Sequence, residues 1–312
     1  MKTLYCIVGP TASGKTAVAI ELAILLKGEI ISADSRQIYK HFPIGTSVPL
    51  TEERKGIRHY FLEELEPEEE MNAGIFGKEA RDVINNIFSR GFIPIMAGGS
   101  GLYIKSVIDG LFEGESKDEE IRKRLNKRLA EEGREKLYDE LKSIDEETAE
   151  KMSPEYSRRV IRALEIYYTT GKKPSEIRKQ KPEINFSSIQ FGLMPEREYL
   201  YERINERVEK MINAGLIDEV VELRDSGLHW RRNNSLDTVG IKEVFRYLDG
   251  EYSYDKMVET IKQNTRKYAK RQITWFKKDK RINWIEIKRG DTVKEITGEI
   301  MDLIKQTKPD SR

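Results

Sequence analysis

The eight residues from Gly9 to Thr16 read GPTASGKT and match the pattern G-x-x-x-x-G-K-[ST] at every fixed position. Glycines in this pattern let backbone N–H groups turn toward a phosphate, and the following helix adds its positive N-terminal end. Lys15 supplies a cation for the terminal phosphates, and the Thr16 hydroxyl can bind Mg²⁺. The sequence therefore predicts a polyphosphate site, held by Gly9, Pro10, Thr11, Ala12, Ser13, Gly14, Lys15 and Thr16.

The segments on either side of this loop favour the same interpretation. An apolar run at Leu4–Val8 predicts a buried strand before the loop. The residues from Ala17 to Leu26 predict a helix after it, which we expect Gly28 to end. A chance glycine-rich turn would not require this strand and helix.

Asp34 is the second residue that could do chemistry. It follows a strand predicted over Glu29–Ser32, at the end where α/β sheets bind their ligands. A further strand, predicted over Phe92–Met96, runs into Gly98-Gly99-Ser100-Gly101, which contains no acid. Asp34 is therefore the acid expected beside the phosphate loop. Its alternative role is to cap a helix or a turn.

The elements that must position these residues change in character along the chain. Strands and helices alternate over the first ~110 residues, including a helix from Ala73 to Ser89 that Asn72 caps, so a parallel sheet is expected. From Lys117 to Gly171 the periodicity is only helical. We predict an α/β fold with a P-loop NTPase-like parallel-sheet core, formed by residues 1–114 and 184–312, and an inserted all-helical domain at residues 115–183.

The second part of the core is predicted to hold two strands, at Ile184–Leu193 and Ile282–Ile287. Its helices are expected at about 196–214, 216–225, 239–248, 254–277 and 293–305. The segment Lys262–Arg281 carries nine Lys or Arg against one acid, and Tyr268, Trp275 and Phe276 lie among them. Such a mixture suits phosphate contacts and base stacking, although aromatic residues at helical spacing also form cores.

The composition excludes several classes of protein. No apolar run is long enough to span a membrane, and Cys6 is the only cysteine, which excludes an intrachain disulfide and a multi-cysteine zinc site. We expect a cytoplasmic protein without membrane contact. The net charge of +1 is uninformative, because the charges are unevenly placed: Glu63–Glu70 alone holds six glutamates.

Taken together, the motifs resemble those of tRNA dimethylallyltransferases, also called tRNA isopentenyltransferases, of the bacterial type. The resemblance covers roughly residues 3–285, with the motifs in family order. The matching segments are GPTASGKT at Gly9–Thr16, ISADSRQIYK at Ile31–Lys40, IGTSVP at Ile44–Pro49, GGSGLYI at Gly98–Ile104, RRVIRALE at Arg158–Glu165, TVGIKE at Thr238–Glu243 and AKRQITWF at Ala269–Phe276.

This resemblance implies transfer of a dimethylallyl group from dimethylallyl diphosphate to N6 of adenine 37 in tRNA, with release of diphosphate and with Mg²⁺ as the cofactor. Lys15 and Thr16 would neutralise the departing diphosphate, and Asp34 would remove a proton from the adenine amine. Thr11 and Thr16 resemble the family's donor-binding hydroxyls. Arg203 and Arg207 are expected to close over the diphosphate.

The family also implies contacts with the anticodon stem-loop of tRNA, and we expect the enzyme to work as a monomer. The segment from Asp34 resembles the one that contacts the extruded base. The expected tRNA-binding residues are Asp34, Ser35, Arg36, Gln37, Ser100, Arg122, Arg158, Arg159, Arg162, Thr238, Gly240, Lys242, Lys270, Arg271 and Gln272. The chain departs from the family at Ile241 and Met71, where many relatives carry an aromatic residue.

Three other functions share part of this pattern. A small-molecule P-loop kinase has the same loop and sheet but needs neither the helical insert nor the basic C-terminal helix. An enzyme that prenylates free adenine nucleotides would not need them either. A non-catalytic RNA-binding protein could use the loop only to bind nucleotide, but the presence of Lys15, Thr16 and Asp34 together speaks against it.

Overall fold

The computed structural model describes residues 2–111, 118–180 and 182–307. The chain forms two compact units, one from Met1–Ile108 with Asn185–Arg312 and the other from Asp109–Ile184. The insertion expected at residues 115–183 differs from the second unit mainly at its start. Residues 115–117 and 181 of that expectation lie outside the described residues.

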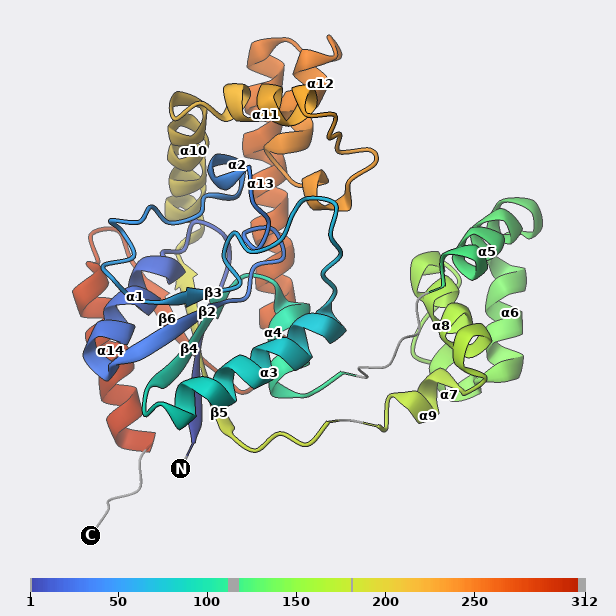
Figure 1. The fold of residues 1–312 in the computed structure, drawn as a ribbon, viewed down its shortest axis with the longest axis horizontal. Coiled ribbons are helices and arrows are strands. Elements are labelled where there is room, and N and C mark those ends of the chain that lie inside the picture. The colour runs from blue at the N-terminus through green and yellow to red at the C-terminus, as the bar shows by residue number, and fades with distance from the viewer. Residues whose placement is uncertain (1, 112–117, 181, 308–312) are drawn as a thin grey trace. The chain divides into compact units, whose positions relative to one another are not determined.

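The larger unit is built on a six-stranded parallel sheet with the order β3-β2-β4-β1-β5-β6 (Figure 1). Strand β1 lies between β4 and β5, with Cys6 opposite Met96 on one side and Gln190 on the other. The fold class predicted from the sequence is confirmed. The strands are β1 (Thr3–Val8), β2 (Gly28–Ser32), β3 (His59–Tyr60), β4 (Ile93–Gly98), β5 (Ser187–Pro195) and β6 (Ile282–Ile287).

Helices cover both faces of this sheet. Successive side chains of β1 point to opposite faces, and both sets are apolar, so each face must be buried. Leu4 and Cys6 belong to one core cluster, whereas Tyr5 and Ile7 belong to the other. Helices α1 (Lys15–Leu26) and α14 (Val293–Thr307) cover the face of Tyr5, and α3 (Ala73–Ser89) and α4 (Gly101–Ile108) cover the face of Cys6 (Figure 1). The remaining helical segments of this unit are α2 (Pro43–Thr46), α10 (Arg197–Asn213), α11 (Leu216–Asp225), η1 (Asn234–Leu236), α12 (Ile241–Leu248) and α13 (Tyr254–Phe276).

The end of α1 corrects one expectation. Lys27, not Gly28, takes the left-handed conformation after the helix, with φ of 53°, and its N–H donates to the Ala23 carbonyl. Gly28 is instead the first residue of β2 and is paired with Ile93. The backbone of a lysine can adopt the left-handed conformation at a modest cost in energy, so the helix does not need the glycine as its cap.

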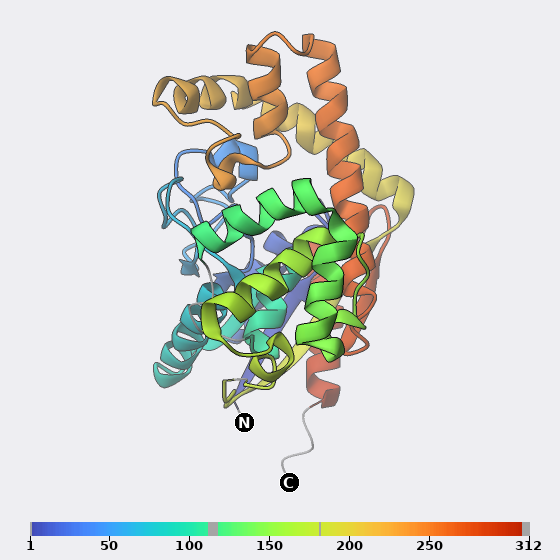
Figure 2. The same cartoon turned by 90° about the vertical axis from the view of Figure 1, so that its right-hand side faces the viewer.

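The described residues of the smaller unit form helices joined by loops, with no strand among them. Helices α5, α6 and α8 pack together (Figures 1 and 2) around Leu125, Leu141 and Leu164, which are fully buried. Asp118 caps α5, because its side chain accepts a hydrogen bond from the Ile121 N–H. The helices are α5 (Glu119–Glu132), α6 (Arg134–Ile144), α7 (Glu146–Ala149), α8 (Ser157–Thr170) and α9 (Pro174–Ile177).

Among the described residues, no helix combines the length and the apolar character that crossing a membrane requires.

Candidate active site

The predicted phosphate loop joins β1 to α1 at the carboxyl end of the sheet. Gly9 has a φ of +146°, and a Cβ atom there would lie 2.6 Å from the Leu193 carbonyl oxygen, so only glycine fits. The Lys15 ammonium donates to the Pro10 carbonyl at 2.6 Å and so lies folded against the loop. The backbone of the loop and the ammonium of Lys15 therefore lie close together, where both could bind one phosphate.

The electrostatics of the loop indicate that an anion belongs there. Burial lowers the pKa of Lys15 to about 7; the Asp34 carboxylate opposes this effect, while Arg207 and Arg203 lower the pKa further. A bound phosphate would restore the charge of the lysine. Ser13, by contrast, is 1% exposed, and its hydroxyl, which has no hydrogen-bond partner within the described part of the chain, is closed off from solvent.

Arg203 and Arg207 are one turn apart on α10, so both side chains project from the same face of the helix. A Cβ atom on Gly14 would lie 3.5 Å from Arg203 Nη2, which places this guanidinium against the phosphate loop. Arg207 donates to the Thr46 carbonyl at 3.5 Å. Burial lowers the pKa of Arg207, and the Asp34 carboxylate opposes the shift. The structure thus brings both predicted arginines to the loop.

Asp34 lies just beyond the carboxyl end of β2. Its Oδ1 accepts hydrogen bonds from the N–H groups of Arg36, at 2.9 Å, and Gln37, at 3.5 Å. One oxygen therefore has the turn-capping role that the sequence left open. Oδ2 makes no hydrogen bond within the part of the chain that the structure describes, so it is available to a ligand.

The carboxylate of Asp34 and the phosphate loop share one cavity of about 1170 Å³. The side chain of Thr16 is exposed, and it lines the same space. The walls include Lys15, Thr16, Asp34, Arg203, Arg207 and Tyr268. Reacting groups bound at the loop and at Asp34 would therefore meet in a single chamber.

The glycines at the end of β4 bring the loop and Asp34 together. A Cβ atom on Gly98 would lie 2.1 Å from the Ala33 carbonyl oxygen, so the chain can pass there only as glycine. The Ser100 hydroxyl accepts a hydrogen bond from the Ser35 N–H at 3.0 Å. Gln272 then connects this segment to the loop: its Oε1 accepts from the Thr11 N–H at 2.8 Å, and its Nε2 donates to the Gly99 carbonyl at 3.0 Å.

Substitution of Gly98 by alanine is expected to lower the free energy of unfolding by about 1–3 kcal/mol, because the added methyl group must displace the Ala33 backbone. Urea denaturation measures the effect. Gly298→Ala in α14 is the matched control, since a methyl group there would meet open space, and alanine should stabilise the helix by up to ~1 kcal/mol. Equal stability of Gly98→Ala and the wild type would show that the junction is loose.

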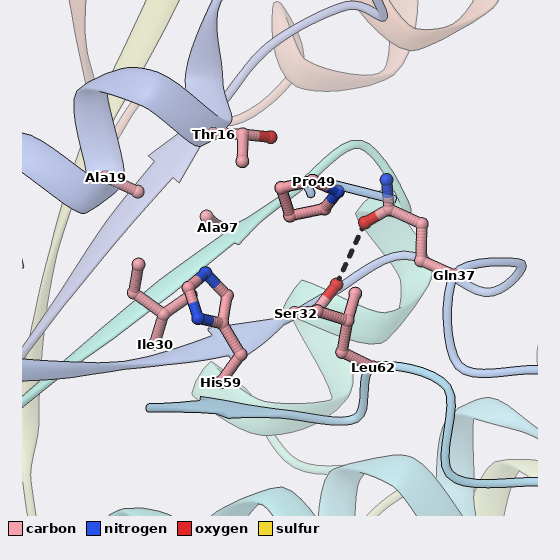
Figure 3. Close-up of a pocket in the computed structure, with 9 residues that line it drawn as sticks. All are labelled: Thr16, Ala19, Ile30, Ser32, Gln37, Pro49, His59, Leu62 and Ala97. Atoms are coloured by element: carbon pink, nitrogen blue, oxygen red, sulfur yellow. Dashed lines mark hydrogen bonds between the residues drawn. The ribbon is translucent and has the colours of Figure 1, made fainter. Parts of the chain in front are cut away.

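The predicted base-contacting segment is partly used in holding the protein together. Gln37 donates to the carbonyls of Thr46 and Ser47, at 3.1 and 3.0 Å, and accepts from the Ser32 hydroxyl at 3.3 Å. Figure 3 shows this last hydrogen bond at the wall of a small pocket of about 20 Å³ beside Thr16. The amide of Gln37 thus supports the cavity wall.

The other predicted tRNA contacts in the larger unit fall into two groups: one lies around the start of α12, and the other lies on α13. Arg36 donates to the carbonyls of Asn234 and Asp237, just before Thr238. Lys242 pairs with Asp237 at 3.2 Å, and Gly240 precedes α12. On α13, Lys270 and Arg271 are exposed whereas Gln272 is buried.

The predicted arginines of the smaller unit are in two different environments. Arg122 and Arg162 both bind the carboxylate of Glu165, each at 2.9 Å, and Glu165 is fully buried. Arg158 and Arg159 are exposed on the surface of α8. Arg159 lies over the exposed ring of Tyr156, 5.1 Å from its centroid. The two exposed arginines are the better placed for a partner.

Tyr268 also lines the cavity, although its sequence context did not mark it as a site residue. Burial raises the pKa of Tyr268 above its usual value, with a further contribution from the Asp34 carboxylate, while a hydrogen bond with Ser100 opposes the shift. Tyr268 therefore lies near the candidate base. The mixture of basic and aromatic residues in its helix was the available signal, but the same signal includes Phe276, which is 3% exposed and belongs to the core.

A divalent cation would find few protein ligands here. No group of three or more His, Cys, Asp or Glu side chains suited to a metal occurs within residues 2–111, 118–180 and 182–307. The exposed hydroxyl of Thr16 in the cavity fits a cation that takes its other oxygen ligands from a bound diphosphate and water.

Comparison with known proteins gives a consistent result. A family model described as IPP transferase matches residues 37–279. The chain is 45% identical over 302 residues to a tRNA dimethylallyltransferase of Acetivibrio thermocellus, with 95% of each chain covered. It is also 45% identical over 286 residues to the enzyme of that name from Geobacillus thermodenitrificans, with 91% of this chain and 90% of the relative covered.

Two solved structures are similar over most of the chain. The tRNA isopentenylpyrophosphate transferase from Bacillus halodurans has a TM-score of 0.72 at 38% identity, covering 98% of this chain and 96% of that one. A eukaryotic dimethylallyltransferase, described as acting on tRNA, has a TM-score of 0.84 at 28% identity, covering 100% and 81%.

Proposed function

Because the chain belongs to the IPP transferase family, we propose that it transfers the five-carbon group of dimethylallyl diphosphate to N6 of adenine 37 in tRNA, next to the anticodon, and releases diphosphate. One observation carries this proposal: the phosphate loop and the Asp34 carboxylate line the same cavity. An enzyme with these two groups can stabilise a leaving diphosphate while it deprotonates an incoming amine.

The donor is expected to bind with its diphosphate on the backbone N–H groups of the loop. Lys15 and Arg203 add positive charge, and Arg207 does so from the next turn of α10. Mg²⁺ bound by Thr16 would supply additional positive charge to the diphosphate oxygens. When the allylic C–O bond breaks, its electron pair passes to the diphosphate, and these groups stabilise the resulting charge.

The acceptor amine is a poor nucleophile, because its lone pair is delocalised into the adenine ring. As N6 bonds to C1 of the dimethylallyl group, it must lose a proton. Asp34 Oδ2 is the acceptor that we propose, while Oδ1 stays bound to the turn. To reach the cavity the adenine must leave its stack, as for other enzymes that act on a base.

The smaller unit is proposed to bind the backbone of the anticodon stem-loop through Arg158 and Arg159, with Arg122 and Arg162 as weaker contributors. Arg122 and Arg162 share the buried charge of Glu165, so part of their charge is already neutralised. Removal of either would also leave this buried carboxylate with fewer partners.

Arg158→Ala combined with Arg159→Ala is therefore expected to weaken tRNA binding and to flatten its salt dependence. The slope of log K against log salt should fall by about 0.7–0.9 for each phosphate group that the double variant no longer binds. Filter binding over a range of salt concentrations measures it. Lys151→Ala with Lys179→Ala is a matched control, because both lysines pair with Glu147. An unchanged affinity and slope would mean that this surface does not bind tRNA.

The test of the function is incubation of the purified protein with labelled dimethylallyl diphosphate, Mg²⁺ and unmodified tRNA, followed by nucleoside analysis. We expect label in N6-dimethylallyladenosine at position 37, with one diphosphate released per nucleoside formed. Transfer to AMP, ADP or ATP in preference to tRNA would indicate the free-nucleotide enzyme. ATP turnover without tRNA, and with no prenyl transfer, would indicate a kinase.

A further inference from the structure

The one-turn helix α2 is held at both ends by charged side chains. At its N-terminal end, Glu219 of α11 accepts hydrogen bonds from the N–H groups of Ile44 and Gly45, at 2.7 and 2.8 Å. Glu219 is 7% exposed. Both oxygens of a buried carboxylate are thus committed to two backbone N–H groups that a helix start leaves unpaired.

The other end of α2 faces the active site. The carbonyls of Thr46, its last residue, and of Ser47, which follows it, accept hydrogen bonds from the amide of Gln37. The Thr46 carbonyl also accepts from Arg207 at 3.5 Å. Arg207 and Ser47 both line the cavity. An anion therefore binds the positive end of α2, and an active-site cation binds its negative end.

Close packing around α2 leaves no room for another group to accept hydrogen bonds from its first N–H groups. A Cβ atom on Gly45 would lie 2.4 Å from Cδ1 of Ile241, which is fully buried at the start of α12. If Glu219 lost one of its accepting oxygens, the N–H group left unpaired could not turn to water without moving α2. Burial raises the pKa of Glu219 to about 7, although the two N–H groups oppose the shift. The ionised form of this carboxylate is therefore destabilised by its burial.

We propose that Glu219 is a positioning residue for the transfer reaction: it fixes α2 so that the Thr46 carbonyl holds Arg207 beside the diphosphate site. The inference rests on the proposed function for its role in catalysis, but its effect on diphosphate binding can be measured separately. Glu219 is not among the residues that line the cavity. It acts through α2 on Arg207, and its loss should matter only while Arg207 is present.

The experiment is a double-mutant cycle of Glu219→Gln and Arg207→Ala. The measurement is binding of inorganic diphosphate with Mg²⁺ by calorimetry, and then kcat/KM for tRNA prenylation. Glutamine keeps the size of the side chain, but its NH₂ group cannot accept from a backbone N–H. We expect Glu219→Gln alone to weaken diphosphate binding and to lower kcat/KM by about 10- to 100-fold. In the Arg207→Ala background it should have little further effect.

Glu29→Gln is the matched control, because Glu29 is also buried in this unit but binds Arg90 and Tyr60. It should leave both measurements unchanged.

If Glu219→Gln does not fold, as judged by circular dichroism, Glu219→Asp takes its place in the cycle, since aspartate keeps the charge but has a shorter side chain. Equal losses with and without Arg207, or no loss in either, would overturn the proposal. If the wild type binds diphosphate but does not prenylate tRNA, the proposed function fails, whereas the cycle in diphosphate binding still tests Glu219.

Discussion

Replacement of Asp34 by asparagine is expected to lower kcat for tRNA prenylation by about 10²- to 10⁴-fold, the range for loss of a general base. Asparagine keeps an oxygen for the N–H groups of Arg36 and Gln37, so the turn after β2 should remain. It cannot take a proton from N6 of adenine. Single-turnover rates with saturating donor measure the effect, and tRNA affinity should be nearly unchanged.

Asp34→Ala separates the two roles of this carboxylate. It removes the base and the turn cap together, so it should be as slow as Asp34→Asn and also less stable, by about 1 kcal/mol for the missing hydrogen bonds. A fast Asp34→Asn enzyme beside a slow Asp34→Ala enzyme would assign Asp34 to the turn alone. The base would then have to be another group.

Replacement of Lys15 by methionine is expected to lower kcat by about 10²- to 10³-fold, because the departing diphosphate loses its nearest cation. The lysine should also make donor binding depend on pH. With a pKa of about 7 in the free protein, Lys15 is mostly uncharged at pH 8 and mostly charged at pH 6. A bound diphosphate favours the charged form, so binding at pH 8 should take up a proton.

Calorimetry of donor binding in buffers of different ionisation enthalpy measures this proton uptake. The wild type should take up close to one proton more than Lys15→Met at pH 8, and the difference should shrink at pH 6. Lys40→Met is a suitable control, because Lys40 pairs with Glu66 at 2.7 Å and its pKa is raised, so it stays charged throughout. Equal uptake by the wild type and Lys15→Met would mean that Lys15 is already charged before the donor binds.

Elements with strong local signals were predictable from the sequence. The helix at Ala73–Ser89 begins at an asparagine whose side chain accepts from two N–H groups, and its predicted bounds are those of α3. The bounds of α11 and β6 also agree with the prediction. Each of these elements has its periodicity and its boundary residues within a short stretch of sequence. The phosphate loop was recognisable for the same reason.

The elements that the sequence did not reveal depend on contacts between distant residues. Helix α2 has only four residues and is fixed by Glu219, which lies on α11. Strand β3 has two residues and exists because it pairs with β2. No local periodicity can arise in segments of this length.

The candidate site shows the same division. The loop residues and Asp34 stand out by pattern, but the proximity of Asp34 to Lys15 follows from the order of the strands, with β4 between β2 and β1. Gln272, which bridges Thr11 and Gly99, lies more than 170 positions along the chain from either of them. The pairing of Arg162 with Glu165 could have been read from their spacing of three, whereas the contribution of Arg122 could not.

The most direct test of the account is a crystal structure of the protein with tRNA and an unreactive thiolo analogue of dimethylallyl diphosphate. We expect the diphosphate on the loop with Lys15, and adenine 37 extruded into the cavity. N6 should lie about 2.6–3.2 Å from Asp34 Oδ2 and about 3–3.5 Å from C1 of the analogue. An adenine whose N6 lies against another group, with Asp34 bound only to its own turn, would contradict it.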